Sequence, residues 1–160
     1  MKNDVKNAWS QIDVQLKRRY DLIPNLVAAV RGYLAHERQV IENVVAARAS
    51  ALTATKVKDR AAAEDGLSDK LKGLFAVMEA YPDLKANQNV MHLQEELVST
   101  ENRIAFARQL YNDLVANYMT RREVFPEIII ASVFSFGPAE YFTAGRDDRQ
   151  LPEASFSSSI

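Results

Sequence analysis

Apolar residues recur at steps of three and four over most of this chain, and that spacing restricts the fold to packed helices. Side chains at this spacing lie on one side of an α-helix. The phase is continuous from Val5 to about Thr53, so we expect one long helical segment there. The positions that form its apolar face are Val5, Trp9, Ile12, Leu16, Tyr20, Ile23, Val27, Val30, Leu34, Ile41, Val44 or Val45, and Leu52.

Pro24 interrupts this first segment, because its ring nitrogen carries no hydrogen for the carbonyl of Tyr20, four residues earlier. The helix either kinks there or ends and restarts. A restart would use Asp21 as a cap, with Pro24 in the first turn of the second helix. We favour a kink, since the apolar face keeps its phase and residues 21–23 contain no glycine to turn the chain.

A connection and a short helix are expected next. Residues 53–66 are rich in alanine and charged residues, and Val57 is the only large apolar residue among them, which indicates a linker. A second apolar face then predicts a helix of about four turns that ends at Tyr81-Pro82. Its positions are Leu67, Leu71, Leu74, Met78 and Tyr81.

The last apolar face is the longest and predicts a helix from about Asn87, roughly 55 Å long at the usual rise per residue. Its positions are Val90, Leu93, Leu97, Ile104, Tyr111, Leu114, Tyr118 and Phe125. The whole pattern predicts an all-α fold, an antiparallel up-and-down bundle of the four-helix type. We place this bundle at residues 1–136. An irregular, partly disordered tail is expected at residues 137–160, where glycine and proline gather.

Charge and motifs argue against several classes of function. The 20 basic and 21 acidic residues give a formal net charge of -1, so we expect no nucleic-acid partner. The chain has no cysteine, which removes disulfides and thiolate metal sites. A di-iron bundle needs Glu three residues before His, but Tyr33 precedes His36 and Asn89 precedes His92 at that spacing. We therefore expect no catalytic residues, no cofactor and no metal.

Polar residues fall on or beside the apolar faces, where a bundle built for stability alone would carry aliphatic side chains. Burying a charge without a partner is costly, so we expect some of them to pair across helices. The first interpretation is a structural network that fixes helix register, and the alternative is a buried or groove-facing ligand site. The candidates are Asp13, Arg19, Asn25, Asn87, Glu101, Asn102, Arg103 and Asn112.

Aromatic residues cluster after the last predicted helix, at Phe134, Phe136, Tyr141 and Phe142. Clustered aromatic side chains suit the grooves of partner proteins, so these four are the best candidates for contact with a partner. The alternative is that they fold back over the open end of the bundle as a cap.

Several blocks of the sequence carry a family resemblance. In order, the chain contains VKNAWSQIDVQLKRRYDLIPNLV at residues 5–27, YPDLKAN at 81–87, ENRIAFAR at 101–108, YN at 111–112 and FP at 125–126. Together with the final ASF at residues 154–156, these blocks resemble the LemA family over essentially the whole chain. Many of the polar candidates lie inside these blocks.

The resemblance implies an up-and-down four-helix bundle in a bacterial protein held at the cytoplasmic membrane by one N-terminal hydrophobic helix. It implies no established biochemical activity. Met1-Lys2-Asn3 stands directly before the signature, so we expect the anchor to be absent from this chain. The leading hypothesis is a non-enzymatic, membrane-tethered interaction or scaffold domain for an unidentified protein partner. The alternative is a sensor that binds a small ligand among the polar residues and signals to the membrane helix.

Overall fold

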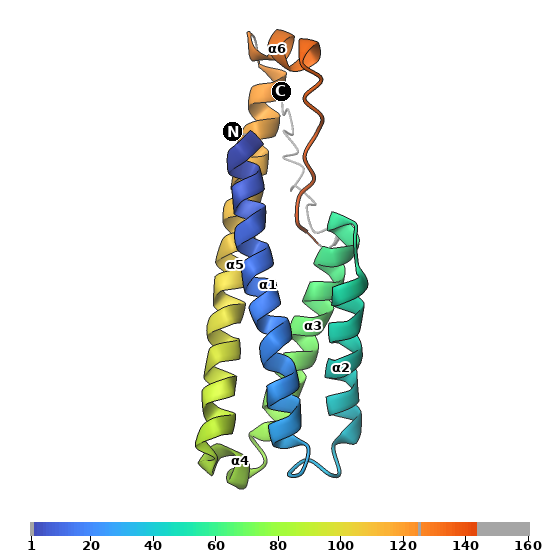
Figure 1. Cartoon of the computed structure of the whole chain (residues 1–160), viewed down its shortest axis with the longest axis vertical. Helices are drawn as coiled ribbons and strands as arrows, with labels where there is room; N and C mark the ends of the chain where they lie inside the picture. Colours follow the sequence, from blue (N-terminus) through green and yellow to red (C-terminus); the bar gives the residue numbers. More distant parts are fainter. Residues whose placement is uncertain (1, 125, 144–160) are drawn as a thin grey trace, which may run out of the picture.

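The computed structural model describes residues 2–124 and 126–143, and every regular element in these residues is a helix (Figure 1). The all-α class predicted from the sequence is confirmed. The helices are α1 (Lys2–Val30), α2 (Arg38–Thr53), α3 (Val57–Met78), α4 (Pro82–Ala86), α5 (Gln88–Glu123) and α6 (Glu127–Val133).

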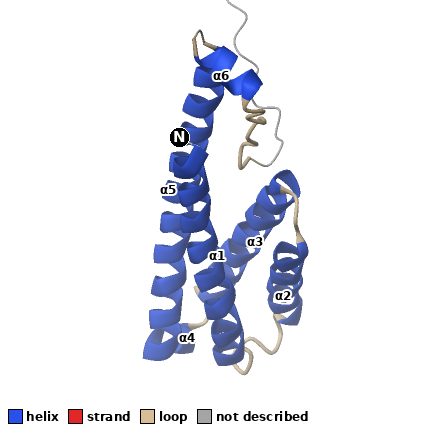
Figure 2. Ribbon diagram, turned by 45° about the horizontal axis from the view of Figure 1, so that its top comes forward, coloured by secondary structure: helices blue, strands red, loops and turns tan. Residues whose placement is uncertain are grey.

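The four long helices are arranged in two pairs, α1 with α5 and α2 with α3 (Figure 1). Successive long helices run in opposite directions along the long axis of the molecule. The α2–α3 pair lies beside only part of the α1–α5 pair, which projects past it and carries α6 at its far end (Figure 2). The N-terminus of the chain lies at this same end.

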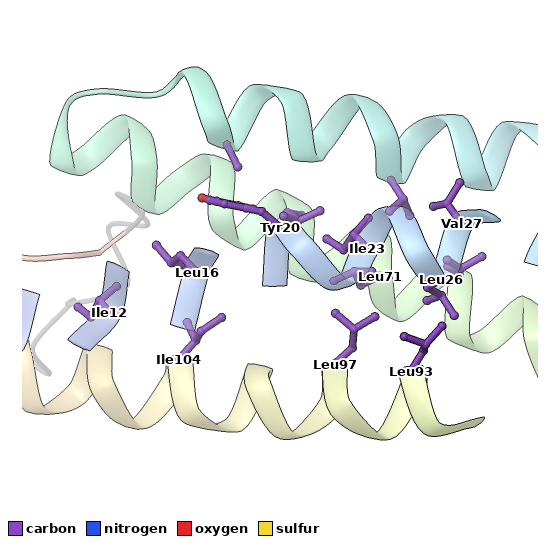
Figure 3. Close-up of a cluster of buried hydrophobic side chains, with 14 of the residues drawn as sticks. Ile12, Leu16, Tyr20, Ile23, Leu26, Val27, Leu71, Leu93, Leu97 and Ile104 are labelled. Atoms are coloured by element: carbon purple, nitrogen blue, oxygen red, sulfur yellow. The ribbon is translucent and has the colours of Figure 1, made fainter. Parts of the chain in front are cut away.

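The hydrophobic core fills the space between the two pairs. Buried side chains of α1, among them Ile12, Leu16 and Ile23, gather with Leu71 of α3 and with Leu97 and Ile104 of α5 (Figure 3). Every position of the first apolar face up to Leu34 is buried or half-buried, as its spacing predicts. The last helix was also predicted well, since α5 begins at Gln88 and has 36 residues.

The prediction of one helical segment from Val5 to Thr53 is wrong. The chain leaves α1 at Val30 and turns through residues 31–37 before α2 begins. Leu34 lies inside this turn, yet it is buried and packs in the core. Leu34 falls at the position where the next buried residue of a continuous helix would lie. The apolar pattern therefore continues through the turn, and the turn cannot be recognised from the pattern.

The linker predicted at residues 53–66 is also wrong, because α3 begins at Val57 and is 22 residues long rather than about four turns. The first half of α3 buries Ala61 and Glu64 instead of large apolar side chains. A search for large apolar residues therefore missed this half of the helix.

Pro24 lies inside α1, and the helix neither ends nor restarts there. The carbonyl oxygen of Tyr20, which Pro24 leaves without its helical donor, accepts a hydrogen bond from Nε of Arg48 on α2, at 2.9 Å. A side chain of the neighbouring helix thus replaces the missing backbone amide and joins α2 to α1.

This replacement predicts a specific coupling between Arg48 and Pro24. Arg48→Met is expected to lower the free energy of unfolding by about 1–3 kcal/mol, because it leaves the Tyr20 carbonyl without a donor. In a Pro24→Ala background the loss should be much smaller, since the new backbone amide takes over that carbonyl. Urea unfolding of the four proteins measures the coupling. An equal loss in both backgrounds would show that the Arg48 bond does not compensate for the proline.

Candidate functional site

Arg19 of α1 is the central polar residue of the core and is 0% exposed. One terminal nitrogen of its guanidinium, Nη2, donates to Oε2 of Glu64 and, at 3.3 Å, to the carbonyl of Glu64 on α3. The other, Nη1, donates to Oε1 of Glu101 on α5 and to Oγ of Ser68 at 2.7 Å. A single side chain therefore joins α1, α3 and α5.

The two carboxylates around Arg19 have further donors. The hydroxyl of Tyr20 donates to Oε1 of Glu64, and Oγ of Ser68 donates to Oε2 of Glu101 at 2.8 Å. Both oxygens of both carboxylates are thus hydrogen-bonded within the group that we call the Arg19 network: Arg19, Tyr20, Glu64, Ser68 and Glu101. Arg19 and Glu101 were predicted as network members and are paired with each other.

The pKa of Glu64 is shifted by its surroundings in the Arg19 network. Burial raises its pKa above the ordinary value of 4.5, because the carboxylate is removed from water. The charge and hydrogen bond of Arg19 lower the pKa, and the nearby Glu101 carboxylate raises it. The net shift is upward, so the folded state binds a proton at Glu64 more tightly than the unfolded chain does.

This shift predicts a pH dependence of stability with a definite sign. The contribution of Glu64 to the free energy of unfolding should be present in full below pH 4.5 and should fall as the pH rises through the higher folded pKa. Glu64→Gln cannot titrate and removes this slope. Urea unfolding of both proteins over about pH 4 to 8 gives the free energy of unfolding of the wild-type protein minus that of the variant at each pH. This difference should fall as the pH rises. A difference that is constant or grows with pH would contradict the raised pKa.

Three other predicted polar residues lie outside the Arg19 network and pair elsewhere. Asp13 forms an ion pair with Nη2 of Arg60 on α3, at 2.7 Å. Asn87 caps α5, where its Oδ1 accepts the backbone amide of Val90 at 3.2 Å. Asn112 accepts the backbone amide of Phe142 at 2.9 Å. These contacts are structural, since each one fixes a helix end, a helix pair or the chain after α6.

Asn25, Asn102 and Arg103 are exposed, so the expectation that they are part of a buried network is wrong. Asn102 and Arg103 lie between Glu101, a member of the Arg19 network, and Ile104, a buried residue of α5. At about 100° of rotation per residue, an adjacent position is enough to turn a side chain away from the core. Asn102 and Arg103 instead line a surface groove.

The groove runs between α1 and α5 and has a volume of about 850 Å³. We call it the α1–α5 groove. Its apolar side chains are unusually exposed for their size, with Phe106 71%, Val98 45% and Leu110 44% exposed. The residues that line it are Gln11, Gln15, Met91, Gln94, Glu95, Val98, Ser99, Asn102, Arg103, Phe106, Ala107 and Leu110. None of the five residues of the Arg19 network is among them.

Gln15 adds a polar feature to the α1–α5 groove. Its carbonyl oxygen Oε1 is buried, and it has no hydrogen-bond partner among the described residues. A buried acceptor without a donor is costly, so this oxygen marks a point where the wall of the groove lacks a hydrogen bond.

The tail aromatics divide into buried and exposed residues. Phe142 is fully buried, with its ring centroid 5.4 Å from Trp9 and 4.9 Å from the guanidinium carbon of Arg108. Phe142 therefore takes the folded-back alternative and is not an exposed contact residue. Phe134 and Tyr141 are exposed, and Phe136 is half-buried. The part of the predicted tail at residues 144–160 lies outside the described residues.

Long paired helices, an ion-pair network in the core and an apolar surface groove define a helical-bundle domain. The sequence model of the LemA family matches residues 8–156, and the chain belongs to this family. The resemblance seen in the sequence is thereby confirmed.

Curated relatives are magnetosome proteins. Magnetosome proteins MamQ 1 and MamQ 2 of Paramagnetospirillum magneticum (strain AMB-1) are each 26% identical over 168 residues. Magnetosome protein MamQ of Magnetospirillum gryphiswaldense (strain MSR-1) is 24% identical over 168 residues. In all three, the match covers 89% of this chain and 62% of the relative, so this chain spans less than two thirds of their length. No helix in the described residues is long and apolar enough to cross a membrane.

Proposed function

We propose that this chain is a non-enzymatic, membrane-tethered interaction domain, and that a partner protein binds in the α1–α5 groove as an amphipathic helix. The observation that carries the proposal is the grouping of exposed Phe106, Val98 and Leu110 in one hollow. Single exposed apolar residues are common on protein surfaces, but a group of them in a concave site is typical of a binding surface.

The shape and chemistry of the α1–α5 groove favour a helix as its occupant. On α5 its lining extends from Met91 to Leu110, a length of about 30 Å along one helix. Two adjacent helices leave a straight furrow that accepts the apolar face of a third helix. Amide and charged side chains flank the apolar residues.

The membrane tether is carried by the family pattern, in which an N-terminal hydrophobic helix holds the bundle at the bacterial cytoplasmic membrane. The start of α1 lies at the end of the molecule where α6 projects (Figure 1). A tether attached there would hold the α1–α5 groove away from the bilayer and leave it accessible to a partner.

A small-ligand sensor is the alternative function, and the unpartnered oxygen of Gln15 favours it. Such a ligand would lie in the same groove and use Gln15, Asn102 and Arg103 for its polar contacts. The Arg19 network does not serve this role, because both oxygens of each carboxylate already accept hydrogen bonds from Arg19, Tyr20 or Ser68.

Phe106→Asp tests the proposed function when it is compared with Val14→Asp. Val14 is also an exposed apolar residue, on α1, but it is not among the residues that line the groove. In protein purified from native membranes, Phe106→Asp should lose its co-purifying partner, whereas Val14→Asp should retain it. Both variants should unfold at the wild-type midpoint, because both positions are exposed. Equal retention by the two variants would contradict docking in the groove.

A further inference from the structure

The end of the molecule formed by α6 carries a second exposed apolar surface. We call it the tip and define it by Val124, Ile128, Ile129, Ile130, Val133 and Phe134. Each of these six side chains is between 45% and 71% exposed. Six large apolar residues lie exposed within eleven positions, and exposed apolar groups of this size mark contact surfaces in soluble proteins.

The distribution of these residues around α6 indicates what covers them. At about 100° per residue, Ile128, Ile129 and Ile130 alone span roughly 200° of the helix circumference. A helix that packs against one protein groove needs a stripe only about half as wide. Apolar residues around most of a helix suit an apolar medium that surrounds it from several sides.

Basic residues lie beside the tip. Lys2, Arg121 and Arg122 line a hollow together with Ile130 and Phe136. The ammonium of Lys2 lies 5.7 Å from the ring centroid of Phe136. The acidic residues Glu123 and Glu127 lie on either side of Val124 in the sequence, so the charge near the tip is mixed. Of the six tip residues, Ile130 shares the hollow with the three cations. Apolar residues bordered by lysine and arginine are the composition of segments that lie in the interface of anionic bilayers.

The chain that follows the tip is hydrogen-bonded to α5. The hydroxyl of Tyr118 on α5 donates to the carbonyl of Gly137 at 2.9 Å, just after α6. The hydroxyl of Tyr111 donates to the carbonyl of Glu140 at 2.8 Å. Both bonds tie the chain that follows α6 back to α5, while the tip side chains themselves point into solvent.

We propose that the tip enters the headgroup region of an anionic lipid bilayer and stands the bundle upright on it. The inference rests on the proposed membrane tether for the identity of the surface. The start of α1 lies at the same end as the tip, so a tether there and the tip would reach the same bilayer (Figures 1 and 2). Phe106 lies about 25 Å along α5 from Glu123, so the α1–α5 groove stays clear of the lipid.

A fluorophore that senses polarity tests this contact, and the absence of cysteine permits a single label. Val133→Cys in the tip and Phe106→Cys in the groove are each labelled with NBD in the 160-residue chain. An N-terminal hexahistidine tag holds each protein on phosphatidylcholine–phosphatidylglycerol vesicles that contain a nickel-chelating lipid. The tag supplies the tether, so the outcome does not depend on the partner or on the natural anchor.

The fluorescence emission of the label at position 133 should shift to shorter wavelength and be quenched by brominated lipid. The emission of the label at position 106 should show neither change. The inference is overturned if the label at position 133 stays unshifted on vesicles, or if it shifts equally without vesicles as protein concentration rises. The second result would indicate that a second copy covers the tip. Neither result would affect the comparison of Phe106→Asp with Val14→Asp.

The charge part of the proposal is tested without the tag. Arg121→Gln and Arg122→Gln should each weaken binding to anionic vesicles by about fivefold, and should change little on neutral ones. Ile129→Asp combined with Val133→Asp should abolish binding to both. A loss of binding on neutral vesicles equal to that on anionic ones would overturn the role assigned to the two arginines.

Discussion

Arg19→Met is expected to lower the free energy of unfolding by about 3–5 kcal/mol, because it leaves a carboxylate inside the core without its cation. Glu64 is only 1% exposed, and its remaining donor would be the Tyr20 hydroxyl. Removing one partner of a buried ion pair is far more costly than removing both. Urea unfolding at neutral pH measures the loss.

Two controls make the Arg19 prediction specific. Arg18→Met removes a pair with Glu96 that is largely exposed, and it should cost less than about 1 kcal/mol. Arg19→Met combined with Glu64→Leu should recover part of the loss, since the unpaired carboxylate is then absent. If Arg19→Met costs no more than Arg18→Met, the Arg19 network does not hold the three helices together.

Phe142→Ala is expected to cost about 3–5 kcal/mol, because it removes a fully buried ring from contact with Trp9 and Arg108. Phe134→Ala is the matched control, since Phe134 is 69% exposed, and it should change stability by less than about 0.5 kcal/mol. Thermal unfolding of the two variants gives the comparison. Equal midpoints would mean that the chain after α6 contributes little to the fold.

The sequence predicted the helices wherever large apolar residues mark the buried face. The position of α5 and the buried apolar face of α1 were therefore predicted correctly. It missed the turn after Val30 because Leu34 is buried in that turn, and it missed the start of α3 because Ala61 and Glu64 occupy the buried positions there. The spacing of apolar residues indicates which residues are buried. It does not show whether a buried residue lies in a helix or in the turn that follows the helix.

The Arg19 network could be predicted in part. Arg19 and Glu101 fall on or beside apolar faces that the sequence makes visible, so both were candidates for pairing across helices, although which residues pair was not predicted. Glu64 was assigned to a linker, although a signal was available: Glu64 lies three positions before Leu67 and seven before Leu71, in phase with the second apolar face. Extending that face backward through Ala61 would have identified both the helix and the second carboxylate.

The α1–α5 groove could not be predicted from the sequence. Its depth depends on how closely α1 and α5 pack, and Phe106 lies off the buried face of α5, where periodicity gives no signal. The tip is a similar case, because a run of isoleucines reads as core in a sequence. Only the position of α6 beyond the two helix pairs shows that these side chains face solvent.

The two exposed surfaces give this LemA-family bundle a division of contacts. We propose protein binding at the α1–α5 groove and lipid binding at the tip, while Arg19 joins α1, α3 and α5 by its hydrogen bonds. In the function that we propose, such a domain holds a partner protein at a membrane.

Photo-crosslinking in the natural protein, in its own membranes, tests this division most directly. Benzoylphenylalanine is placed at position 106 in the groove, at position 133 in the tip and at position 14 on the exposed side of α1. This division predicts protein adducts at position 106, whose contacts on the partner recur every three or four residues, lipid adducts at position 133, and neither at position 14. Protein adducts at position 14 as abundant as those at position 106, or none at position 106, would contradict it.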